Sequence, residues 1–167
     1  MESGQVMMID LAYEDKMNSK ENKSLTKQIE LIMKAIKHID DPPSIHLCSF
    51  GGQAQTQLEK MGYQYWPLTV HTEDISEVGH NLGKKLVYLS PDAEEPLEKV
   101  EKGTLFYYTD TAYILGGLID RSIIKNASVN RARSFDIEAR RIPIRQYMKN
   151  RIVLNLDHVI SMVMNYR

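Results

Sequence analysis

The stretch that most constrains the fold of this chain is residues 113–121, Tyr-Ile-Leu-Gly-Gly-Leu-Ile-Asp-Arg. An apolar run leads into two glycines, and two more apolar residues lead to Asp120 and Arg121. This pattern is typical of a buried strand that ends in a tight turn. Asp120 would then follow the carboxyl end of a strand, where open α/β sheets bind ligands. On this stretch alone, a plain strand and turn in which Asp120 caps the next segment explains the pattern equally well.

The rest of the chain alternates short apolar runs with helical patterns. Strands are predicted at residues 5–11, 45–50, 65–70, 86–89, 105–108 and 112–115. Helices are predicted over 25–36 with Ser24 as N-cap, after Gly51-Gly52, after Asn126 or Ser128, and from Asn155 to the end. Strands that alternate with helices indicate an α/β fold, with a mainly parallel sheet flanked by helices. We expect one domain over residues 1–167, as the catalytic domain of a longer protein.

Composition limits the classes of function. The chain has 167 residues, a net charge of −1 and no apolar run long enough to span a membrane. Cys48 is its one cysteine, which excludes an internal disulfide and a cysteine-rich zinc site and favours a reducing compartment. Residues 121–151 hold nine basic side chains against two acidic ones, a local surplus that attracts phosphates. Because the whole chain is nearly neutral, any nucleic-acid contact is either local or supported by charge from other parts of a longer protein.

Three carboxylates lie at or just after the ends of predicted strands, namely Asp10, Asp92 and Asp120. If these strands are neighbours, the acids would converge at one edge of the sheet and could hold Mg²⁺, as in metal-dependent nucleases. The more common role of such acids is to cap the following helices. The five histidines show no metal-ligand spacing, and neither a Walker phosphate loop nor a dinucleotide-binding glycine motif is present.

Four segments together resemble a known family. They are residues 9–15 with 24–29, residues 87–92, residues 113–121, and residues 139–147 followed by 152–155. Their combination is similar to the tRNA (purine-9-N1)-methyltransferase family, which methylates N1 of the purine at tRNA position nine. The first segment and the Cys48 strand are closer to the mitochondrial member, and residues 113–121 are closer to the nucleocytoplasmic members.

The resemblance implies a SPOUT fold, in which a C-terminal trefoil knot builds the S-adenosylmethionine site of a monomeric domain. The cofactor residues that it implies are Leu89, Ser90, Gly116, Gly117, Leu118, Arg121, Ser128, Arg141, Ile142, Pro143, Ile144, Val153, Leu154 and Asn155. Asp120 is the implied general base, and Gln28 is expected to hydrogen-bond the purine edge. The residues expected to hold tRNA phosphates are Arg121, Lys125, Arg131, Arg133 and Arg140. No metal is required.

Two features depart from the family pattern. The basic motif that usually follows the first helix is replaced by Ile-Lys-His-Ile-Asp at residues 36–40, and the segment between Leu97 and Tyr113 is long enough to predict an insertion. A mitochondrial location would imply a dehydrogenase partner and a nuclease subunit, and the alternative location is the nucleus or cytoplasm. Two other functions stay open, a metal-dependent nuclease and a scaffold subunit that needs partners for catalysis.

Overall fold

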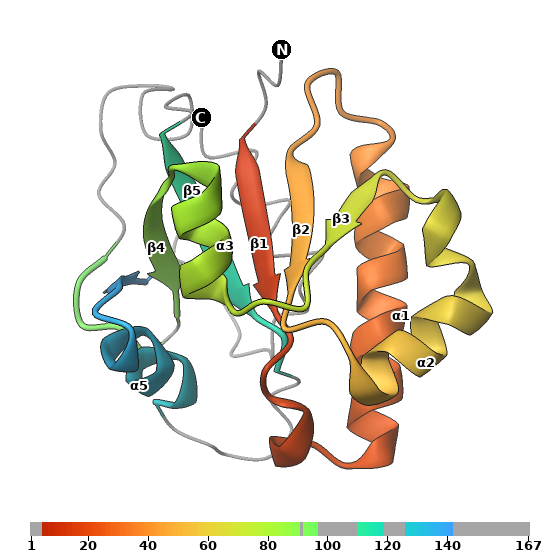
Figure 1. Ribbon diagram of the computed structural model, residues 1–167, viewed down its shortest axis with the longest axis horizontal. Helices are drawn as coiled ribbons and strands as arrows, with labels where there is room; N and C mark the ends of the chain where they lie inside the picture. The colour runs from red at the N-terminus through yellow and green to blue at the C-terminus, as the bar shows by residue number, and fades with distance from the viewer. Residues whose placement is uncertain (1–4, 91, 97–109, 119–125, 142–167) are drawn as a thin grey trace, which may run out of the picture.

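The computed structural model describes residues 5–90, 92–96, 110–118 and 126–141. Within them, six strands form one sheet in the order β3-β2-β1-β5-β4-β6, and every neighbouring pair is parallel (Figure 1). The strands are β1 (Val6–Asp10), β2 (Ser44–Cys48), β3 (Leu68–Val70), β4 (Lys85–Leu89), β5 (Thr111–Gly116) and β6 (Glu138–Arg140). The predicted α/β fold with a mainly parallel sheet is confirmed.

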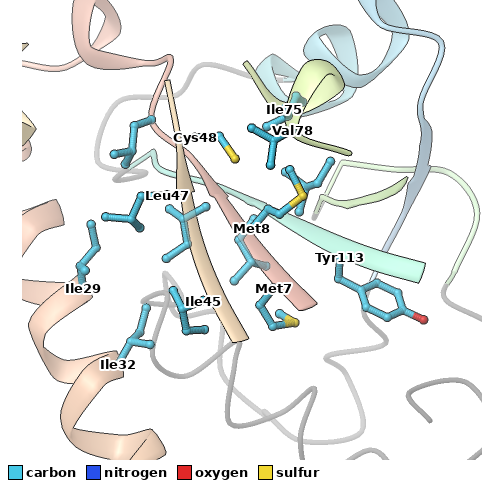
Figure 2. Close-up of a cluster of buried hydrophobic side chains, with 14 of the residues drawn as sticks. Met7, Met8, Ile29, Ile32, Ile45, Leu47, Cys48, Ile75, Val78 and Tyr113 are labelled. Atoms are coloured by element: carbon cyan, nitrogen blue, oxygen red, sulfur yellow. The ribbon is translucent and has the colours of Figure 1, made fainter. Parts of the chain in front are cut away.

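Helices cover both faces of this sheet. They are α1 (Ser19–Ile36), α2 (Gly52–Met61), α3 (Ile75–Leu82) and α5 (Ala127–Ser134), with short 3-10 turns η1 (Glu14–Lys16) and η2 (Tyr63–Tyr65). Figure 2 shows Ile29 and Ile32 of α1 beside Ile45 and Leu47 of β2 on one face. On the other face, Ile75 and Val78 of α3 lie near Cys48 and Met8. All of these side chains are buried and belong to one contiguous hydrophobic cluster, which includes the sheet and the helices on both of its faces.

The start of α1 differs from the prediction. Its N-cap is Asn18, whose side chain accepts the Glu21 N–H at 2.8 Å, while the Glu21 carboxylate accepts the Asn18 N–H at 3.1 Å. This reciprocal capping box satisfies two backbone donors that a helix start otherwise leaves without partners. The predicted cap, Ser24, lies inside the helix.

Other elements also differ from the prediction. The strand expected over 65–70 is shorter, because residues 63–65 form η2 and Pro67 has no N–H to donate to a neighbouring strand. Helix α3 was not predicted, although Asp74 caps it by accepting the Glu77 N–H and Gly83 ends it with a φ of 64°. The strand at 105–108 and the helix after Asn155 lie outside the described residues.

Cys48 is buried in the hydrophobic core. Burial, with a smaller effect of nearby carboxylates, raises the pKa of its thiol to about 12. The thiol is therefore neutral at physiological pH. None of the described helices is both long enough and apolar enough to cross a membrane.

Candidate functional site at the carboxyl edge of the sheet

The register of the sheet brings the ends of three strands together. Asp10, the last residue of β1, is level with Gly116 of β5, and Leu89 of β4 is level with Leu115. Beyond β5, the Gly117 N–H donates to the Asp10 carbonyl at 2.8 Å. A Cβ added at Gly117 would lie 2.8 Å from that same oxygen, which is too close. The turn after β5 therefore needs glycine because its backbone lies directly on β1.

The carboxylate of Asp10 is fully buried, with a side-chain exposure of 0%. Its Oδ2 accepts hydrogen bonds from the Tyr88 hydroxyl at 2.9 Å and from Arg131 Nε at 2.7 Å. Its Oδ1 accepts the Ala12 N–H at 3.2 Å, and Arg131 Nη2 lies 3.4 Å away. A buried charge has to be paired and hydrogen-bonded to be tolerated, and here both conditions are met.

Two tyrosines extend this network. The Tyr13 and Tyr88 hydroxyl oxygens lie 2.6 Å apart. The Tyr88 hydroxyl donates its hydrogen bond to Asp10, so the Tyr13 hydroxyl is the donor in the hydrogen bond between the two tyrosines. Burial raises the pKa of Tyr13 to about 12 and raises the pKa of Tyr88 well above its ordinary value, so both stay neutral at physiological pH. A Cβ at Gly116 would lie 3.3 Å from the Tyr88 hydroxyl, so the two tyrosines pack directly against the glycine turn.

These buried hydroxyls predict a loss of stability at alkaline pH. Burial also raises the pKa of Tyr113 to about 12, whereas tyrosine in an unfolded chain ionises near pH 10. The folded state therefore holds its phenolic protons more tightly, and this stabilisation is complete below about pH 10 and lost as pH rises through about 12. Urea unfolding between these pH values, followed with tyrosinate absorbance, should show this decline. A flat free energy of unfolding across the interval would contradict it, and Tyr88→Phe should make the decline smaller.

A second contact joins α5 to the end of β4. The Ser128 hydroxyl donates to the Ser90 Oγ at 2.6 Å, and that oxygen also accepts the Asp92 N–H at 3.2 Å. The Asp92 carboxylate in turn accepts the Asn126 N–H at 3.0 Å, just before α5 begins. The structure thus brings together predicted cofactor residues from three separate segments. These residues are Leu89 and Ser90, Gly116 and Gly117, and Ser128.

The remaining predicted cofactor residues divide into two groups. Arg141 is tied to the segment after β4, with its N–H donating to the Glu95 carbonyl at 2.8 Å and its guanidinium to the Ala93 carbonyl at 3.3 Å. Leu118 follows the glycine turn and is half-buried. The predictions for Asp120, Arg121, Lys125, Ile142, Pro143, Ile144, Val153, Leu154 and Asn155 lie outside the described residues, as does the segment that would form the knot.

Gln28 lies on the inner side of α1. Only 7% of its surface is exposed, and its side chain already interacts within the protein. Its expected hydrogen bond to a purine stays a prediction.

A cavity of about 390 Å³ lies between α5, β6 and residues 92–95. Four acidic residues and Arg133 are among those that line it, and the acidic residues are Asp92, Glu94, Glu95 and Asp136. None of the described residues predicted to bind the cofactor lines it. This cavity is therefore separate from the glycine turn.

The described residues give no support to a metal site. They contain no group of three or more histidine, cysteine, aspartate or glutamate side chains that could hold an ion. Asp10 is neutralised by Arg131, and the Asp92 carboxylate accepts the N–H of Asn126, the residue just before α5. The third proposed ligand, Asp120, lies outside the described residues.

Two arginines that were expected to contact tRNA phosphate form ion pairs within the protein. Arg131 was expected to contact tRNA phosphate, but its guanidinium binds the buried Asp10 and lies 4.9 Å from the centre of the Phe135 ring. Arg140 has two carboxylate neighbours, Glu95 at 3.2 Å and Glu138. Arg133 is exposed and stays available for the predicted phosphate contact.

An exposed row of lysines on α1 was not predicted as a binding surface. We call it the α1 lysine face, and it consists of Lys20, Lys23, Lys27 and Lys34 with Lys37 at the C-cap of the helix, all exposed. Glu30 is its one acidic neighbour on the outer side of the helix, 2.6 Å from Lys27 and 3.7 Å from Lys34. A helix of 18 residues is about 27 Å long, so the row can span several phosphates of a nucleic acid. The helical spacing of the lysines is the sequence signal that could have revealed it.

Comparisons with known proteins agree with this geometry. A family model described as tRNA (guanine(9)-N(1))-methyltransferase TRM10/TRM10A matches residues 1–167. The tRNA (guanine(9)-N1)-methyltransferase of Candida glabrata is 31% identical over 170 residues, which cover 98% of this chain and 57% of that protein. The tRNA methyltransferase 10 homolog A of Mus musculus is 28% identical over 96% of this chain and 48% of its own length. The chain thus spans about half the length of these curated relatives.

A solved structure shows the same fold. The crystal structure of full-length spTrm10 in complex with SAH superposes with a TM-score of 0.82 at 25% identity, covering 98% of this chain and 89% of that one. The parallel sheet, with a glycine turn and the start of a helix gathered at one edge, defines an α/β protein of the SPOUT class. With the family model matching its whole length, the chain belongs to the tRNA (guanine(9)-N(1))-methyltransferase family, TRM10/TRM10A.

Proposed function

We propose that this protein transfers a methyl group from S-adenosylmethionine to N1 of the purine at tRNA position nine. The observation that carries the proposal is the bare backbone of Gly116 and Gly117, packed on Asp10 beside Ser90 and Ser128. Family membership supports the reaction, and the SAH-bound relative supports the cofactor.

The described residues fit this cofactor. A backbone without side chains lets a flat, extended ligand approach closely, and Ser90 and Ser128 offer hydroxyl groups at the same edge. S-adenosylmethionine, when bound, supplies the methyl group. Residues of the family pattern that lie beyond Arg141 would complete the site through the trefoil knot.

The role of the protein is to position the purine and to move one proton. Guanine N1 carries a proton and is a poor nucleophile until the proton leaves, so Asp120 acts as the general base. Adenine N1 already has a lone pair and needs no base. Holding the two reacting groups in line supplies much of the acceleration.

Methyl transfer from labelled S-adenosylmethionine to tRNA transcripts with guanine or adenine at position nine tests this function. We expect label in N1-methylguanine at that position, with or without a metal chelator. Intact cofactor binding without transfer to either tRNA would favour the partner-dependent scaffold. Cleavage of tRNA that stops with chelator would favour the nuclease.

The α1 lysine face should contribute to tRNA affinity. Replacing Lys23 and Lys27 together by Gln removes two charges that can neutralise phosphates, so the KM for tRNA should rise several-fold and its salt dependence should become less steep. Affinity for S-adenosylhomocysteine should stay the same. Lys60→Gln, on α2, is the control and should change neither value. An unchanged tRNA KM in the double variant would show that this face does not bind tRNA.

The compartment and partners are proposals from the resemblance alone. We place the protein in the mitochondrion with a dehydrogenase partner and a nuclease subunit. Localisation of a tagged chain, and methyl transfer with and without an added dehydrogenase, test these points. A nuclear or cytoplasmic signal would overturn the first point, and full activity alone would overturn the need for the dehydrogenase.

A further inference from the structure

Asp10 connects the three segments that meet at the candidate cofactor site. Its main-chain carbonyl holds the Gly117 N–H, and its carboxylate holds the Tyr88 hydroxyl of β4 and the Arg131 guanidinium of α5. The glycine turn, the end of β4 and helix α5 are therefore fixed relative to one another through a single residue. Of these three partners, Arg131 is the most distant from Asp10 in the sequence, at a separation of 121 residues.

Arg131 lies one turn after Ser128 on α5. The helix is thus attached to the sheet at two points, through Ser128 to Ser90 at 2.6 Å and through Arg131 to Asp10 at 2.7 Å. The Arg131 side chain is 23% exposed, and Phe135 lies beside its guanidinium. Burial lowers the pKa of Arg131, but its hydrogen bond to Asp10 and the charge of Asp10 outweigh this effect and raise the pKa overall.

We propose that Arg131 is a positioning residue for the methyl-transfer site, which acts through Asp10 to hold Ser128 and the Gly116–Gly117 turn at their working separation. This proposal rests on the proposed function. It gives Arg131 a role in cofactor binding and catalysis, in place of a contact with tRNA phosphate. A bidentate guanidinium suits this role better than an ammonium group, since its planar fork fixes an angle as well as a distance.

Arg133 provides a matched comparison. It lies two residues further along the same helix, has the same side chain and is exposed. The experiment measures the Kd for S-adenosylhomocysteine by calorimetry, and kcat and KM for tRNA methylation, in the wild type, Arg131→Met, Arg131→Lys and Arg133→Met. Thermal unfolding of each variant shows which fraction is folded at the assay temperature.

We expect Arg131→Met to weaken S-adenosylhomocysteine binding about tenfold or more and to lower kcat, while KM for tRNA stays the same. Arg131→Lys should recover part of the cofactor affinity, because it keeps the charge and loses the second donor. Arg133→Met should show the reverse, with a raised KM for tRNA and normal cofactor binding. A raised KM for tRNA and unchanged cofactor affinity in Arg131→Met would overturn the proposal.

The double variant Asp10→Asn with Arg131→Met separates positioning from general loss of stability. It removes both charges of the ion pair and leaves no unpaired buried carboxylate, so it should fold better than Arg131→Met alone. The two single variants, Asp10→Asn and Arg131→Met, are measured beside it. If Arg131 acts through Asp10, cofactor affinity in the double variant should fall no further than in these single variants. Additive losses would mean that the two residues act independently and would overturn the proposal. Failure of the proposed function itself is distinguished by a wild type that neither binds S-adenosylhomocysteine nor methylates tRNA.

Discussion

Asp10→Ala is expected to lower the free energy of unfolding by about 3 kcal/mol, toward the low end of the range for breaking a buried ion pair. The change leaves the Arg131 guanidinium and the Tyr88 hydroxyl without their acceptor, and it opens a small void at the edge of the sheet. The expected loss lies at the low end because Arg131 is 23% exposed and can turn partly toward water. Urea unfolding at neutral pH measures the difference.

Asp10→Asn is the matched control for this prediction. It keeps the size of the side chain and an oxygen that can accept the Tyr88 hydroxyl, and it removes the charge. We expect a smaller loss, about 1–2 kcal/mol. Equal stability of Asp10→Ala and wild type would contradict the network described at this edge, and equal losses in both variants would mean that only the charge matters.

Asp120→Asn is expected to lower the rate of guanine methylation by about 10²–10⁴-fold, the usual contribution of a positioned general base. Asparagine keeps the size of aspartate but cannot take a proton from guanine N1. Single-turnover methyl transfer with saturating cofactor measures the chemical step.

The same variant carries its own control. Adenine N1 has no proton to lose, so methylation of a tRNA with adenine at position nine should change little in Asp120→Asn if the wild type accepts that substrate. Full guanine activity in the variant would remove the base role. Equal losses on both purines, with weaker cofactor binding, would instead give Asp120 a role in holding the cofactor.

The sequence was sufficient to predict the fold class, because the core strands are short apolar runs whose burial needs no information from elsewhere in the chain. It predicted the positions of β1, β2, β4 and β5 from such runs. It misplaced the cap of α1, since Ser24, Asn18 and Ser19 are all residue types that can cap a helix. Only the reciprocal bond between Asn18 and Glu21 decides between them.

The candidate site was predicted in part. Ser90, Gly116 and Ser128 were expected to meet, and the structure brings their segments to the same edge. The pattern of charges did not reveal that Arg131 turns inward while Arg133 turns outward, because both lie in the same basic block. That difference depends on the position of Asp10, which is set by the order of the strands and not by any local signal.

The position of β1 in the sheet has a consequence for how the chain folds on the ribosome. β1 is the first strand of this sheet to be made, yet it lies between β2 and β5, and β5 begins about 100 residues after β1 ends. At ribosomal rates of about 5–20 residues per second, one edge of β1 stays without its partner strand for roughly 5–20 seconds. During that time β1, β2 and β3, with α1 packed on one face, can form while the β5 side of β1 exposes unpaired backbone groups. A nascent chain stalled before Thr111 should therefore be the form of this protein most prone to aggregation and most dependent on chaperones.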